Sequence, residues 1–375
     1  MIYLDNAATS AKKPDSVYRS LIFATVNNSI NAGRGGYASS KSASEILFNT
    51  RMSLSRLFNI DNPERIVCAH NTTHALNMAL KGVLSYGDHV IYTSMEHNSV
   101  HRPIKALEKS KRVRSSVLKA DENGILNVED LHRLIRPGTK LICLTHSSNV
   151  CGNINDIYRA AEIAKEHGVL FLVDGAQSAG ILDIDTQKID MLAFPGHKGL
   201  MAPMGTGGLF VRDTITLDTI IEGGTGSLSE LEYQPEIMPD RLESGTQNVP
   251  AIAALGTAAE FILETGTENI KTHEDMLCDY FESRIREMPN VEVYGGNNKT
   301  AICAFNIRGL DCVEAAGILG DEYGIAVRAG LHCAILAHKT LGTHETGLIR
   351  ASFGYFNTLQ EVQKAVDAVY KLSKN

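Results

Sequence analysis

The stretch Val169-Leu-Phe-Leu-Val-Asp-Gly-Ala-Gln177 combines an apolar run of strand length with an acidic and an amide side chain directly after it. A second apolar run ends at Pro195-Gly-His-Lys198 and leads into a glycine-rich segment that reaches Gly208. Because parallel strands end at the same edge of a sheet, we expect Asp174 and Lys198 to share one crevice. A carboxylate and an amine placed in this way can hold opposite ends of a planar, electron-withdrawing cofactor, which predicts a pyridoxal phosphate site. The alternative is that Asp174 caps a turn and that Lys198 is an ordinary solvated lysine.

Short apolar runs alternate with longer helical patterns over the first part of the chain. This alternation predicts an α/β fold, with a mostly parallel sheet covered by helices on both faces. The apolar runs are Arg65–Ala69, His89–Thr93, Lys140–Leu144 and Val169–Val173, and helical patterns cover residues 75–84 and 157–167.

The alternation of apolar runs with helical patterns ends after Val211. From Ala251 a long helical pattern runs towards Arg286. Because Pro250 opens that pattern, we place a domain boundary close to it. The prediction is a large cofactor-binding domain over residues 13–250. Residues 251–375, together with residues 1–12, are expected to form a smaller α+β domain.

Composition narrows the class of protein. The 375 residues include 36 Lys and Arg against 43 Asp and Glu, a formal charge of −7 that argues against nucleic-acid or anionic-membrane partners. The seven cysteines form no CxxC pair, and an odd number cannot pair completely, so we expect a reducing cytoplasm. Nowhere do eighteen apolar residues run together, and the start lacks a signal pattern, so we expect a soluble, unexported protein.

The segment Asn71-Thr-Thr-His74 follows a strand-like run and opens a helix. Hydroxyls and free backbone amides at a helix amino end suit a phosphate, so Thr72 and Thr73 are candidate phosphate ligands. The alternative is that one of these threonines only caps the helix.

Further cofactor contacts are expected near Asp174, because an anion beside a pyridine nitrogen keeps that nitrogen protonated. Gln177 is a candidate partner of the ring hydroxyl or makes a turn hydrogen bond. His197 is a candidate phosphate contact or a packing histidine. His97, at the end of the His89–Thr93 strand, can stack on the ring and move protons near neutral pH.

No metal is expected. His97 with His101 and His70 with His74 form HxxxH pairs, but neither pair carries the glutamate of a zinc-protease motif. A zinc site built from Cys333 and nearby histidines fits no familiar spacing.

Cys333 closes the segment Arg328-Ala-Gly-Leu-His-Cys333. Arg328, His332 and free loop amides can raise the thiolate share of this cysteine, which makes it a candidate nucleophile, although most lone cysteines are buried and inert. Arg350 can clamp a substrate carboxylate, or it forms an ordinary surface ion pair.

These motifs together resemble the cysteine desulfurase and selenocysteine lyase group of class V aminotransferase-like enzymes. The resemblance runs in order along nearly the whole chain and implies a fold-type I pyridoxal phosphate enzyme. The motifs are Tyr3–Thr9, Thr72–Thr73, Glu96–His97, Ser148–Asn149, Asp174–Gln177, Gly196–Lys198, Glu243–Thr246 and Arg328–Cys333.

The resemblance also implies roles for individual residues. Lys198 would hold the cofactor, and Cys333 would take sulfur as a persulfide from L-cysteine, or selenium from L-selenocysteine, leaving L-alanine. Thr246 would reach the phosphate of the partner in a homodimer, and a sulfur-acceptor protein is a further possible partner. The other implied contacts are Asp174 with the pyridinium, Gln177 with the ring oxygen, His97 on the ring, Thr73 and His197 with phosphate, and Asn149 and Arg350 with the amino acid.

Two positions depart from the family pattern. Pro195 stands where many relatives have a phosphate-binding serine, which removes one hydroxyl and one backbone donor. Leu331 replaces a histidine that is common in the cysteine loop. The expected function is therefore a cysteine desulfurase. The rivals are a selenocysteine lyase or another aminotransferase, a non-catalytic scaffold, and a nicotinamide enzyme, which the absence of GxGxxG after the early strands disfavours.

Overall fold

A computed structural model describes residues 1–32 and 37–374. Its largest sheet has seven strands in the order β2-β8-β7-β6-β5-β3-β4. Strands β3 to β7 are parallel to one another, whereas β8 runs antiparallel to both β7 and β2. The predicted α/β fold with a mostly parallel sheet is confirmed. The strands of this sheet are β2 (Ile66–Cys68), β3 (His89–Thr93), β4 (Arg114–Leu118), β5 (Thr139–Thr145), β6 (Leu170–Asp174), β7 (Met191–Pro195) and β8 (Gly207–Val211).

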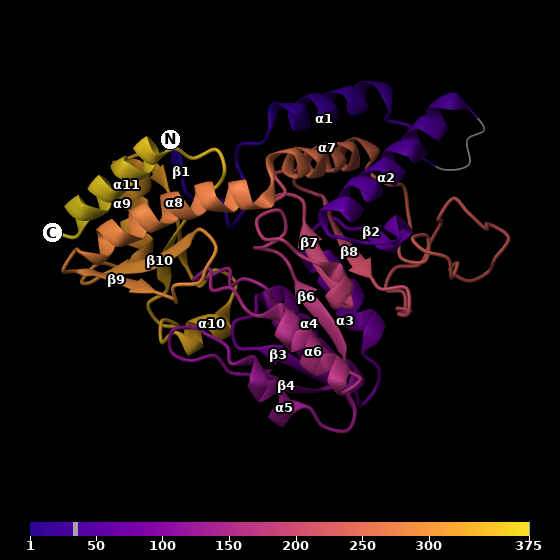
Figure 1. Cartoon of the computed structure of the whole chain (residues 1–375), viewed down its shortest axis with the longest axis horizontal. Helices are drawn as coiled ribbons and strands as arrows, with labels where there is room; N and C mark the ends of the chain where they lie inside the picture. The colour runs from indigo at the N-terminus through magenta and orange to yellow at the C-terminus, as the bar shows by residue number, and fades with distance from the viewer. Residues whose placement is uncertain (33–36, 375) are drawn as a thin grey trace.

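Helices cover both faces of this sheet because its central strands are apolar on both sides. Neighbouring side chains on β6 belong to different cores: Phe171 and Val173 pack with α1, α2, α6 and α7, whereas Leu172 packs with α3 and α4. Figure 1 shows α7 lying beside α1 and α2. These helices are α1 (Asp15–Asn27), α2 (Ala38–Leu57), α3 (Thr72–Val83), α4 (Asn98–Lys111), α6 (Ile157–Glu166) and α7 (Val249–Thr265), and the short α5 covers Leu131–Leu134.

The last third of the chain builds a second, antiparallel sheet in the order β12-β13-β10-β9. The first strand of the chain joins this part, because β1 pairs in parallel with β11 and Leu4 lies in its core. The first residues and the end of α11 therefore lie in the same part of the molecule (Figure 1). The elements are β1 (Ile2–Tyr3), β9 (Val291–Tyr294), β10 (Ile302–Ile307), β11 (Ile325–Ala326), β12 (Arg328–Gly330), β13 (Leu348–Ser352), α8 (Thr267–Arg286), α9 (Cys312–Asp321), α10 (Ile335–Thr340) and α11 (Leu359–Leu372).

The helical pattern from residue 251 to 286 is not one helix. It divides into α7 and α8 at Gly266, whose φ of 84° lies in the left-handed region that favours glycine. Among the described residues no single helix is long and apolar enough to cross a membrane; only this pair together reaches that length, and it bends by 81°. The predicted domain boundary near residue 250 stays a prediction, and α7, which follows it, packs against α1 and α2.

Candidate active site

Lys198 and Asp174 lie in one pocket of about 290 Å³ at the carboxyl edge of the large sheet. They come from neighbouring parallel strands, because Asp174 ends β6 and pairs with Ala193 of β7. All the predicted site residues except Thr246 line this pocket. A volume near 300 Å³ is at the lower end of the range for small-molecule sites. Lys198 is therefore not a lysine of the open surface.

Burial shifts the pKa of both groups towards neutrality. The pKa of Lys198 is lowered to about 8, first by burial and then by the nearby Arg350 charge, while Asp174 opposes the shift. The pKa of Asp174 is raised to about 6 by burial, against a hydrogen bond from the Ala176 N–H and the attraction of Lys198. At neutral pH the pocket can thus hold a carboxylate beside an amine that releases its proton readily.

The chain before Lys198 needs a glycine. A Cβ atom on Gly196 would lie 2.0 Å from the Thr206 Oγ1 atom, so no larger residue fits there. The next carbonyl, that of His197, accepts hydrogen bonds from the Thr9 and Ser10 side chains and from the Ser10 N–H. These contacts fix the backbone from which Lys198 enters the pocket.

The amino end of α3 also faces the pocket, and Asn71 caps it: the Asn71 side chain accepts a hydrogen bond from the His74 N–H. The expectation that Thr72 or Thr73 acts only as a cap is therefore wrong. Thr72 Oγ1 is buried and has no hydrogen-bond partner, whereas Thr73 Oγ1 lies 2.7 Å from Ser99 Oγ. A buried hydroxyl without a partner at a helix amino end is suited to an anionic ligand.

His97 caps α4 through its ring, because Nδ1 accepts a hydrogen bond of 3.0 Å from the Ser99 N–H. The proton of the neutral ring therefore belongs on Nε2. Burial, followed by the Lys198 charge, lowers the pKa of His97 to about 4, which keeps the ring neutral. No group of three or more His, Cys, Asp or Glu among the described residues is placed to hold a metal.

The Cys333 loop is tied to the pocket on both sides. The Asn98 N–H donates to the Cys333 carbonyl at 2.7 Å, and the Asn149 side chain donates to the His332 carbonyl at 2.8 Å. The Cys333 Sγ atom lies 3.8 Å from a terminal nitrogen of Arg328. Of the seven cysteines, all within the described residues, Cys333 alone is exposed. A packing role explains the other cysteines better than it explains Cys333.

Arg350 is only 1% exposed, so the alternative of a surface ion pair is wrong. Its guanidinium donates to the Asp5 carboxylate at 2.7 Å and to the Asn149 carbonyl at 2.7 Å, while its Nε is buried without a partner. Gln177 uses its amide nitrogen to bind the Ala7 carbonyl at 2.9 Å. The first residues of the chain therefore form one wall of the pocket.

Thr246 lies elsewhere, in a hollow that it shares with Glu243 and Gln247. A single chain does not bring it to Lys198. The role that the resemblance implies for Thr246 requires a second chain and stays a prediction.

Asp5, Asn71 and Ser99 received no role from the sequence, although each holds a predicted residue in place. Asn71 had a usable signal, because asparagine is a preferred helix cap and precedes two threonines. Ser99 and Asp5 had none, because their partners are set by tertiary structure.

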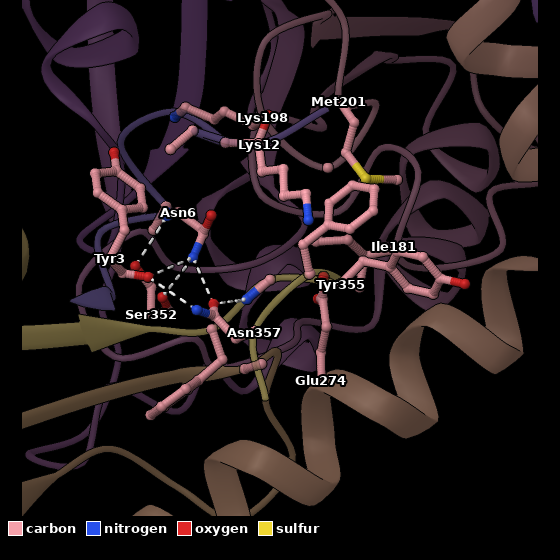
Figure 2. Close-up of a pocket in the computed structure, with 18 of the residues that line it drawn as sticks. Tyr3, Asn6, Lys12, Ile181, Lys198, Met201, Glu274, Ser352, Tyr355 and Asn357 are labelled. Atoms are coloured by element: carbon pink, nitrogen blue, oxygen red, sulfur yellow. Dashed lines mark hydrogen bonds between the residues drawn. The ribbon is translucent and has the colours of Figure 1, made fainter. Parts of the chain in front are cut away.

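A second pocket, of about 140 Å³, lies on another side of Lys198. Figure 2 shows it bordered by Lys198, by Tyr3 and Asn6 of the first residues, and by Glu274 of α8. Asn6 donates hydrogen bonds to the Asn357 side chain and to the Ser352 carbonyl, both at 3.0 Å (Figure 2). These bonds join the start of the chain to the end of β13 and to the loop that follows it.

Glu274 is buried at this pocket, and one of its carboxylate oxygens has no partner. Burial raises its pKa to about 8, despite a hydrogen bond from the Tyr355 backbone. In the unfolded chain the group loses its proton near pH 4.3 or so. Between these two pH values the folded state keeps a proton that the unfolded chain has released. The stability of the folded state therefore falls as pH rises towards about 8.

Glu274→Gln is therefore expected to stabilise the protein more at pH 8.5 or so than at pH 5 or so, by at least about 1 kcal/mol. The measurement is the free energy of unfolding in urea at the two pH values. Asp279→Asn, an exposed position on the same helix, is the control. If Glu274→Gln changed the free energy of unfolding equally at both pH values, the raised pKa of Glu274 would be contradicted.

Comparison with known proteins gives the family. The family model for class-V aminotransferases matches residues 2–365. The chain belongs to the class-V aminotransferase family. A probable cysteine desulfurase from Methanothermobacter thermautotrophicus is 35% identical over 372 residues, which cover 96% of this chain and 92% of the relative. A cysteine desulfurase from Salmonella choleraesuis is 30% identical over 385 residues, which cover 100% of this chain and 94% of the relative.

Solved structures of cysteine desulfurases have the same fold. The apo cysteine desulfurase from Thermococcus onnurineus superposes with a TM-score of 0.93 at 31% identity, covering 100% of this chain and 94% of that one. The cysteine desulfurase CsdA from Escherichia coli gives a TM-score of 0.90 at 28% identity, over 99% of this chain and 94% of its own. The predicted fold-type I architecture is confirmed.

Proposed function

We propose that this class-V enzyme is a pyridoxal phosphate-dependent cysteine desulfurase, which converts L-cysteine to L-alanine and receives the sulfur on Cys333. The observation that carries the proposal is that Cys333, the exposed cysteine, opens into the same pocket as Lys198 and Asp174. A nucleophilic thiol beside a lysine-and-carboxylate cofactor site distinguishes sulfur transfer from simple amino-group exchange.

The residues of the pocket fit pyridoxal phosphate. Lys198 would hold the cofactor, Asp174 would face the pyridine nitrogen, and the amino end of α3 would receive the phosphate through Thr72, Thr73 and the neighbouring His197. The unpaired Thr72 hydroxyl supplies a donor that the folded chain itself does not use. His97 and Gln177 border the same space and suit the ring. When bound, this cofactor withdraws electrons from the α-carbon of an amino acid.

Arg350 and Asn149 would orient the substrate. The guanidinium of Arg350 can donate to the substrate carboxylate through its unpaired Nε and its remaining terminal hydrogens. Arg328 borders the pocket on the side of Cys333 and adds a second positive charge. The amino acid would then lie with its side chain towards Cys333.

Lys198 moves the protons in the reaction, and Cys333 takes the sulfur. The Lys198 amine, with its lowered pKa, accepts the α-proton and returns a proton to the product carbon. The Cys333 thiolate attacks the substrate sulfur, a sulfur–sulfur bond forms, and the carbon–sulfur bond breaks with its electron pair left on the carbon. The β-carbon takes up one proton, which balances the proton that the Cys333 thiol released, and the α-carbon regains its proton from Lys198, so that the product is alanine. Cys333 keeps the sulfur as a persulfide for an acceptor.

A homodimer in the cytoplasm is part of the proposal. Thr246 would complete the phosphate site of the partner chain. Large apolar side chains on α1 support an interface, because Ile22, Phe23 and Val26 are each more than 60% exposed.

The rate of cofactor uptake should report the Lys198 pKa. Since only the unprotonated amine reacts, the rate constant for binding pyridoxal phosphate to apoenzyme should rise about tenfold per pH unit and level off near pH 8. Stopped-flow absorbance from about pH 6.5 to about 9.5 measures this. A rate that still climbs steeply at the upper end would indicate a lysine with an ordinary pKa.

The test of the proposed function compares two amino acids. Holoenzyme is incubated with L-cysteine or L-selenocysteine, alanine is quantified, and the adduct on Cys333 is identified by mass spectrometry. Desulfurase function predicts alanine from cysteine and one extra sulfur on Cys333. Alanine from selenocysteine alone would support the selenocysteine lyase instead.

A further inference from the structure

The backbone of the Cys333 loop is held in an uncommon conformation. His332 and Cys333 have φ values of 48° and 54°, two consecutive non-glycine residues in the left-handed region. This conformation is unfavourable for a residue that has a Cβ atom, so the surrounding structure must hold both residues in place. The bonds from Asn98 and Asn149 hold the two carbonyls, but they do not hold the His332 side chain.

A buried series of hydrogen-bonded side chains holds the imidazole of His332. His332 Nδ1 lies 3.2 Å from His338 Nε2, the two rings stack with an interplanar angle of 9°, and His338 Nδ1 lies 2.9 Å from Thr343 Oγ1. At the other end, His332 Nε2 lies 3.5 Å from the Arg328 carbonyl. His338 is completely buried and Thr343 is 2% exposed, so water does not replace these bonds.

The donor and the acceptor of each hydrogen bond follow from the Arg328 carbonyl at one end of this hydrogen-bonded series. The Arg328 carbonyl can only accept, so His332 Nε2 carries its proton and its Nδ1 accepts from His338 Nε2–H. His338 Nδ1 is then an acceptor and takes the Thr343 hydroxyl proton. Both rings are neutral, because burial lowers the pKa of His332 to about 2 and that of His338 to about 4.

We propose that His338 and Thr343 are positioning residues that orient the Cys333 thiol through the imidazole of His332. The proposal rests on the proposed function, since the thiol must meet the substrate sulfur. His338 lies on α10 and Thr343 just beyond it, and neither lines the pocket, whereas the His332 side chain to which His338 is bonded does.

Thr343 offers a matched pair of variants. Thr343→Val keeps the shape but removes the hydroxyl, which leaves the buried Nδ1 of His338 without a donor, so the His338 ring is no longer held in place to donate to His332. We expect kcat for alanine formation to fall about tenfold, with KM and cofactor absorbance unchanged, because a small misplacement of a reacting group is costly. Thr343→Ser keeps the hydroxyl and should restore kcat to within about twofold of the native enzyme.

His338 gives a second pair in case the valine variant folds poorly. His338→Gln keeps a nitrogen donor for His332 and should retain most of kcat, whereas His338→Leu removes it and should lose about tenfold. A fall in thermal stability with kcat intact in both His338→Leu and Thr343→Val holoenzymes would overturn the proposal and leave these residues a purely structural role.

Nitrogen NMR of histidine-labelled holoenzyme separates this inference from the proposed function. The account requires both His332 and His338 to be protonated on Nε2 in the native enzyme, whatever reaction it catalyses. A native His338 protonated on Nδ1 would overturn the proposed hydrogen bonds from Thr343 through His338 to His332, even if cysteine is converted to alanine. If both rings carry the proton on Nε2 but no alanine forms, the proposed function is rejected and the hydrogen-bond assignment stands.

Discussion

Replacing Cys333 with serine is expected to lower alanine formation from L-cysteine by at least about a thousandfold, because the hydroxyl is a far weaker nucleophile towards sulfur than a thiolate. Cofactor absorbance should be unchanged, since the contacts of Lys198 and Asp174 do not involve Cys333. The measurement is alanine release under saturating cysteine, together with the visible spectrum of the holoenzyme.

Cys312→Ser is the matched control for this experiment. The Cys312 thiol is buried and lies 3.1 Å from the Thr346 carbonyl, to which a serine hydroxyl can also donate. Its activity should stay close to that of the native enzyme. Undiminished turnover in Cys333→Ser would show that sulfur leaves the substrate without this thiol, and the sulfur-transfer role would have to be withdrawn.

Replacing Lys198 with alanine is expected to reduce alanine formation by at least about a thousandfold, through the loss of the group that moves the α-proton. The variant should also lose pyridoxal phosphate on dialysis more readily than the native enzyme, because no covalent link remains. Turnover and retained absorbance after dialysis are the two measurements. Lys105→Ala, which removes a lysine from the surface of α4, should change neither. Retention of turnover in Lys198→Ala would assign the proton transfer to another residue.

The sequence predicts the centre of the site well, because the signals there are local. Asp174 and Lys198 each follow a strand-length apolar run, and the rule that parallel strands end at one edge brings them together. The same reasoning places His97 after β3. These predictions need only that the strands are parallel, which the alternation of apolar runs with helical patterns indicates.

The rest of the site depends on contacts between distant parts of the chain. Arg350 binds Asp5, which lies 345 positions earlier, and no local pattern marks that pair. The cap of α3 is Asn71 and not a threonine, which only the geometry decides because asparagine and threonine are both good caps. The sequence does not predict the break between α7 and α8, because the helical pattern continues through Gly266.

The most direct test of the account is to reduce purified holoenzyme with borohydride, digest it, and locate the pyridoxyl group by mass spectrometry. The account predicts that the group is attached to Lys198 and that Asp174→Asn weakens its retention before reduction. A pyridoxyl group on any other lysine, or a protein that takes up no pyridoxal phosphate, would contradict the assignment of this pocket.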